Sequence, residues 1–81
     1  MRYDKAAESL QEHYEDWMEA LSSGNIMDYT DAMAEMIKMY ANLLGVSESA
    51  ISTKMLEAET LELAEKAING DADAYNRLAE I

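Results

Sequence analysis

The sequence predicts a single all-α domain over residues 1–81, built as a small bundle of four or five helices. Three observations indicate this fold class. The length of 81 residues suffices for one modest core. Proline is absent and glycine occurs only at positions 24, 45 and 70, so each glycine marks an expected helix end. Between the glycines, apolar residues recur at alternating spacings of three and four, which is typical of amphipathic helices.

The first expected helix runs from about residue 4 to residue 22. Asp4 is its expected N-cap, because a carboxylate at that position accepts hydrogen bonds from the free amides of the first turn. Alternating spacings of four and three place one apolar stripe along this helix: Tyr3, Ala7, Leu10, Tyr14, Trp17 and Leu21. The stripe predicts that one side of the helix packs into the core.

The second expected helix begins after Gly24 and ends at Leu44. Asn25 and Asp28 resemble a capping box in which aspartate replaces the usual glutamate. The apolar positions are Ile26, Tyr29, Met33, Met36, Ile37, Tyr40, Leu43 and Leu44. This face is wider than one packing partner needs, so the helix is either central to the bundle or half of a dimer interface. A homodimer is therefore expected, with these self-association residues: Met33, Met36, Ile37 and Tyr40.

The third expected helix begins at Ser47, whose hydroxyl is suited to capping the free amides. Val46 and Ile51 have the spacing of a hydrophobic staple. The apolar pattern falters near residues 57–60, so either a separate helix starts at Thr60 or one helix continues to residue 69, and we favour the break. A last helix over about residues 71–80 is expected to be capped by Asp71.

Residues 37–56 resemble the helix-turn-helix motif of phage repressor and Cro proteins. The matching positions are Ala41, Leu44, Gly45, Val46 and Ile51. A small residue suits the close helix crossing, and a glycine suits the left-handed turn. The resemblance implies a helix-turn-helix-like corner in the bundle and a dimeric DNA-binding regulator as one function. The residues that it would place at DNA are Ser47, Glu48, Ser49, Ser52, Thr53 and Lys54.

The charge distribution favours a different partner. The chain has 17 acidic and 6 basic residues, a net charge of -11, which repels DNA phosphates and steers the protein toward basic protein surfaces. The first expected helix and the region after residue 56 carry most of the acidic residues. The expected protein-binding residues are Glu8, Glu12, Glu15, Asp16, Glu19, Glu57, Glu59, Glu62 and Glu65. Carboxylate rows also serve solubility alone on many proteins.

Three functions follow from these patterns. The first is a small acidic binding protein that mimics nucleic acid and inhibits a basic nucleic-acid-binding protein; in size and charge the chain resembles small DNA mimics of phage origin, including some anti-CRISPR proteins. The second is the DNA-binding regulator. The third is a structural or dimerisation module.

Enzymatic chemistry is not expected. No cysteine, glycine-rich phosphate loop or serine with a recognisable base is present. Asn69, Asp71, Asp73 and Glu80 have the spacing of calcium ligands in an EF-hand, but Ala74 replaces the required glycine. We therefore expect no catalytic residue, metal or cofactor.

Without an apolar run long enough to cross a membrane, a cytoplasmic location is expected.

Overall fold

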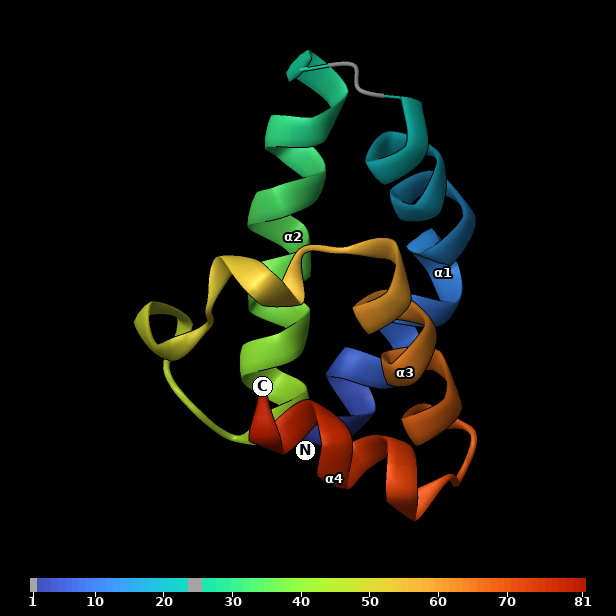
Figure 1. The fold of residues 1–81 in the computed structure, drawn as a ribbon, viewed down its shortest axis with the longest axis vertical. Coiled ribbons are helices and arrows are strands. Elements are labelled where there is room, and N and C mark those ends of the chain that lie inside the picture. Colours follow the sequence, from blue (N-terminus) through green and yellow to red (C-terminus); the bar gives the residue numbers. More distant parts are fainter. Residues whose placement is uncertain (1, 24–25) are drawn as a thin grey trace.

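Two long antiparallel helices, joined at one end of the molecule, support two shorter helices (Figure 1). The structure is a computed structural model that describes residues 2–23 and 26–81. Within these residues the order is α1 (Arg2–Ser23), α2 (Ile26–Leu44), two short 3-10 turns, η1 (Glu48–Ala50) and η2 (Thr53–Met55), then α3 (Ala58–Ile68) and α4 (Ala72–Glu80). The predicted all-α bundle is confirmed.

The apolar stripe of α1 lies mostly in the core. Leu10 and Trp17 are almost fully buried, and Tyr14 and Leu21 pack against the core at its edge. The helix begins before the predicted cap, so Asp4 lies in its first turn and is exposed. The prediction that Asp4 is the N-cap is therefore wrong. A carboxylate in the first turn still stabilises the helix through its dipole.

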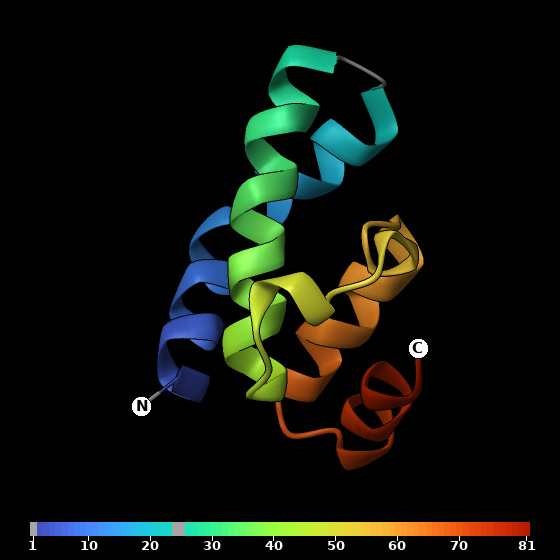
Figure 2. The same ribbon diagram turned by 90° about the vertical axis from the view of Figure 1, so that its left-hand side faces the viewer.

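The wide apolar face of α2 is covered by the same chain. Met36, Met39 and Tyr40 are at most 1% exposed, because α1 packs on one flank of α2 and the segment after Leu44 folds back over the other (Figure 2). Side chains buried within one chain cannot contact a second copy, so this burial contradicts the expectation that Met36 and Tyr40 serve self-association. Met33 and Ile37, the other two expected residues, are only half-buried. The expected capping box at Asn25 and Asp28 lies outside the described residues and side chains.

The turn that ends α2 has the left-handed glycine that the sequence predicts. Gly45 has a φ of 69°, in the left-handed region. The Val46 amide donates to the Ala41 carbonyl at 3.0 Å, as in a Schellman motif, and so satisfies one of the free carbonyls at the helix end. Ala41 is buried, as expected for a position of close packing.

The helix predicted to begin at Ser47 does not form. The chain makes η1 and η2 instead, with extended residues at Ser47, Ile51 and Ser52. Ser47 makes no side-chain cap, whereas the Ser52 hydroxyl accepts from the Lys54 amide at 3.2 Å. Serine and threonine side chains that bond to nearby backbone compete with helix hydrogen bonds, so this serine-rich segment turns twice without building an α-helix.

The predicted break before residue 60 is confirmed, and α3 starts at Ala58. Thr60 is not its cap; it is buried in the first turn, and its hydroxyl donates to the Lys54 carbonyl at 3.3 Å. At the start of α4 the predicted cap is present, since the Asp71 carboxylate accepts from the Ala74 amide at 3.1 Å. These contacts fix where the last two helices begin.

Side-chain hydrogen bonds tie α4 and the start of α1 to the rest. The Tyr75 hydroxyl donates to the Leu43 carbonyl at 3.3 Å, and the Tyr3 hydroxyl donates to the Ala67 carbonyl at 3.0 Å. The start of α1 and the end of α4 therefore lie in one half of the molecule, opposite the end of α1 and the start of α2 (Figure 1).

Replacing Gly45 with valine should lower the free energy of unfolding by about 1–2 kcal/mol. A Cβ at this position would meet no atom within 4 Å, so the cost is backbone strain and not a clash. Gly45→Asn is the matched control, because asparagine tolerates the left-handed region better and should recover part of the loss. Urea denaturation of the three proteins checks this. Equal midpoints for all three would mean that the corner does not impose its conformation.

Candidate functional site

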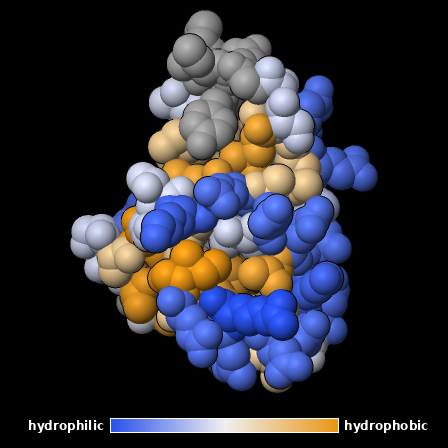
Figure 3. All heavy atoms as spheres, in the orientation of Figure 1, coloured by the Kyte–Doolittle hydropathy of each residue, from blue (hydrophilic) through white to orange (hydrophobic). Residues whose placement is uncertain are grey.

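The predicted acidic residues are carried by α1, by α3 and by the residue immediately before α3. Figure 3 shows hydrophilic residues concentrated over the side that carries α1 and α3. All the predicted protein-binding residues are exposed except Glu65, which is half-buried: Glu8, Glu12, Glu15, Asp16 and Glu19 on α1, Glu57 immediately before α3, and Glu59, Glu62 and Glu65 on it. We call this set the acidic side.

A groove between α1 and α3 brings Glu65 of α3 close to predicted acidic residues of α1. Its volume is about 400 Å³, and its lining includes Glu12, Glu15 and Asp16 from α1 and Glu65 from α3. Tyr14 lies between them. Burial, followed by the charges of Glu65 and Glu62 and a hydrogen bond to Glu65, raises the pKa of Tyr14. The phenol therefore stays neutral and donates to a carboxylate within an acidic surface.

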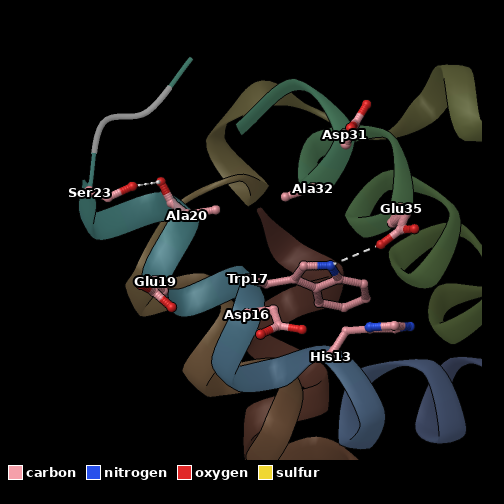
Figure 4. Close-up of a pocket in the computed structure, with 9 residues that line it drawn as sticks. All are labelled: His13, Asp16, Trp17, Glu19, Ala20, Ser23, Asp31, Ala32 and Glu35. Carbon is pink, nitrogen blue, oxygen red and sulfur yellow. Dashed lines mark hydrogen bonds between the residues drawn. The ribbon is translucent and has the colours of Figure 1, made fainter. Parts of the chain in front are cut away.

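A second cavity, of about 440 Å³, opens between α1 and α2. We call it the acidic cleft. Its described lining contains four carboxylates and no lysine or arginine: His13, Asp16, Trp17, Glu19, Ala20, Ser23, Asp31, Ala32 and Glu35 (Figure 4). Asp16 borders both this cleft and the groove on the other side of α1. The two cavities are thus parts of one continuous negative surface around α1.

Packing of α1 on α2 organises the cleft. The Trp17 indole N–H donates to Glu35 Oε2 at 3.3 Å, and the His13 ring stacks on the indole with centroids 5.6 Å apart (Figure 4). Ala20 and Ala32 face the same cavity from opposite helices, and their short side chains leave it open. The floor is therefore apolar and aromatic, while the rim is acidic.

Sequence reasoning missed Asp31 and Glu35. They are four residues apart on α2, so they share a face of that helix, and they border its apolar stripe. The same spacing joins His13 and Trp17 on α1. These spacings indicate that each pair shares one helix face. Only the packing of α1 against α2 shows that the two pairs line one cavity.

The residues that the helix-turn-helix resemblance would place at DNA lie elsewhere. They fall in the segment of η1 and η2, on the side of α2 away from α1 (Figure 1). Ser52 is half-buried and the others are exposed: Ser47, Glu48, Ser49, Thr53 and Lys54. No α-helix presents these side chains as a group. The hydroxyls of Ser47 and Ser49 instead lie 3.1 Å apart, within hydrogen-bonding distance of each other.

Metal binding finds no support in the described part of the chain. None of the groups of histidine, aspartate and glutamate there is arranged to hold a metal ion. In the segment with EF-hand spacing, Asp71 is occupied as the helix cap of α4. Among the described helices, none is long and apolar enough to cross a membrane.

Comparison with family models, with curated proteins and with solved structures finds no match to this chain. Similarity therefore contributes nothing to a functional assignment. The chemistry of the acidic side and the acidic cleft is the basis for the proposal below.

The Tyr40 hydroxyl is a buried polar group beneath these surfaces. Tyr40 is fully buried, and its hydroxyl has no hydrogen-bond partner among the described residues. Burial, with a smaller contribution from Tyr14, raises the pKa of Tyr40 above the ordinary value of 10. A group whose pKa is raised on folding contributes stability that is complete below pH 10 and is lost as the pH rises toward the folded-state value. The free energy of unfolding should therefore fall in alkaline solution.

Tyr40→Phe tests this account. At neutral pH the change removes an unpaired buried hydroxyl, so the free energy of unfolding should stay the same or rise by up to about 1 kcal/mol. Above pH 10 the variant should lose less stability than the wild type, because phenylalanine does not ionise. Urea denaturation at neutral pH and above pH 10 measures both effects. A variant that is clearly less stable at neutral pH would show that the hydroxyl has a partner.

Proposed function

We propose that the protein is a small acidic binding module that occupies a basic surface of a nucleic-acid-binding protein and inhibits it by mimicking nucleic acid. The observation that carries the proposal is the continuous negative surface around α1. Carboxylates from three helices, α1, α2 and α3, border its two cavities, and no lysine or arginine is among their described lining residues. Such a surface attracts cationic partners and repels phosphates.

The spacing of the charges on α1 supports mimicry. Glu8, Glu12, Glu15 and Glu19 repeat at intervals of four, three and four residues and are all exposed. With a rise of about 1.5 Å per residue, the row extends for about 16.5 Å with a charge about every 5.5 Å along the helix axis. One strand of DNA carries a phosphate about every 3.4 Å along its axis. The row therefore has roughly 60% of the linear charge density of one DNA strand, and a groove built for a nucleic-acid backbone offers cations that such a row can meet.

Like charges at these helix spacings are a cost to the fold. Each pair three or four residues apart destabilises a helix by about 0.2–0.5 kcal/mol. Solubility alone requires net charge but no regular row on one helix. A binding role gives the regular row a physical purpose, which a purely structural or dimerisation module lacks.

Competition with nucleic acid tests the proposal. The protein should retard no random duplex DNA in an electrophoretic assay at low salt. It should capture basic nucleic-acid-binding proteins from a cell lysate and, when added to a purified one, displace nucleic acid from it. Binding should weaken steeply with salt, because the Debye length falls from about 10 Å at 0.1 M to about 3 Å at 1 M.

Two results would contradict it. Salt-independent binding would mean that an apolar surface makes the contact. A specific DNA site that the wild type retards at physiological salt, and that Ser49→Ala and Thr53→Ala variants no longer retard, would replace the proposal with the DNA-binding regulator.

A further inference from the structure

We infer that the acidic cleft between α1 and α2 is the anchor point of this interaction and receives an arginine side chain of the partner. The inference rests on the proposed function and deepens it, because it names the chemistry of one contact. What distinguishes the cleft from the rest of the acidic side is its combination of an apolar floor, Trp17, Ala20 and Ala32, with carboxylates on both walls (Figure 4).

The size and burial of the cleft select a side chain as its occupant. Its volume of about 440 Å³ is in the lower part of the range for small-molecule pockets, about 300–1,000 Å³. The floor residues are at most 7% exposed, so a partner touches little of them and meets mainly the exposed carboxylates of the rim. A long side chain that lies across the cleft places its aliphatic stem over the alanines and its charged end against the carboxylates of the rim.

The chemistry of the walls favours arginine. Asp16 comes from α1, whereas Asp31 and Glu35 come from α2, so a guanidinium with several donors in one plane suits them better than an ammonium. The Trp17 indole holds Glu35 through Oε2, which leaves the other oxygen, Oε1, for a ligand. Holding a carboxylate in place before binding reduces the entropy that the complex loses.

Trp17 also provides the means of detection. It is the single tryptophan of the chain, and it contacts the cleft through both its lining position and its bond to Glu35. A guanidinium that reaches Glu35 should change the tryptophan emission. The probes are an arginine-rich peptide and a lysine-rich peptide of equal length and charge, titrated at low salt.

The decisive comparison uses two double variants of equal net charge. Asp31→Asn with Glu35→Gln removes two carboxylates of the cleft while leaving an oxygen to accept from Trp17. Glu57→Gln with Glu59→Gln removes two exposed carboxylates that line neither cavity. Because a hydrogen bond to a charged group inside a cleft contributes more than a solvated ion pair does, the cleft variant should bind the arginine peptide at least about tenfold more weakly than the control variant.

We also expect the wild type to prefer the arginine peptide to the lysine peptide, with an emission change that the cleft variant loses. Ala32→Leu, which fills the cleft without altering charge, should weaken binding as well, once circular dichroism shows it to be folded. Equal weakening by the two double variants would overturn the cleft as the anchor and leave the proposed function intact. No binding of either peptide to the wild type at low salt would overturn both.

Discussion

Trp17→Ala should lower the free energy of unfolding by about 3–5 kcal/mol, the range for deleting a large buried aromatic side chain. Trp17 is 2% exposed and is among the largest fully buried side chains of the core. It also supports the stacked His13 ring and holds the Glu35 carboxylate. Domains have only about 5–15 kcal/mol of stability, and small ones bury a smaller share of their surface. The variant should therefore be largely unfolded at elevated temperature.

Trp17→Phe is the control for this prediction. It keeps an aromatic ring in the core and loses the indole N–H, so it should cost clearly less than alanine. Denaturation followed by circular dichroism suits the series, because both variants lose the only tryptophan emission. Similar losses for alanine and phenylalanine would show that the bond to Glu35, and not the volume of the indole, dominates the contribution of Trp17.

Reversing the α1 row should abolish binding to the basic partner. Changing Glu8, Glu12, Glu15 and Glu19 together to lysine moves the net charge from -11 to -3, since each reversal adds two units. The row then repels the cations that it attracted, and like charges opposed across an interface cost several kcal/mol. The fold should remain helical, because these positions are exposed and lysine and glutamate have similar helix propensities.

The matched variants for the reversal are Ser49→Ala and Thr53→Ala, which lie in the segment of the 3-10 turns and should bind as the wild type does. Isothermal titration with the purified partner provides the affinities, and circular dichroism verifies the fold of each protein. Undiminished binding by the reversed protein would exclude the acidic row as the contact surface.

Local signals account for the parts of the fold that could be predicted. Repeating apolar residues marked α1 and α2, Gly45 marked the corner, and Asp71 marked the start of α4. Each of these depends on neighbours within a few residues. The same reasoning wrongly predicted a helix in the segment after Gly45. Its apolar pattern is compatible with a helix, but side-chain hydrogen bonds such as that of Ser52 compete with the backbone hydrogen bonds of a helix.

Tertiary packing accounts for what the sequence could not reveal. The width of the apolar face on α2 predicted several neighbours but could not distinguish a second copy from the rest of the same chain, which buries Met36 and Tyr40. The acidic residues on α1 and α3 could be predicted as exposed. The cleft could not be predicted, because Asp31 and Glu35 line a cavity only when α2 packs beside Trp17.

The position of the chain ends affects how binding can be measured. Tyr3 is tied to the end of α3, and Ile81 follows directly on α4, whereas the acidic cleft is lined by the C-terminal half of α1 and the N-terminal half of α2. An affinity tag, a fluorophore or a sensor surface attached at either terminus would therefore sit at the opposite end of the molecule from the cleft. Immobilisation through a terminus presents the cleft to solution, and a fusion partner at either end leaves its entrance free.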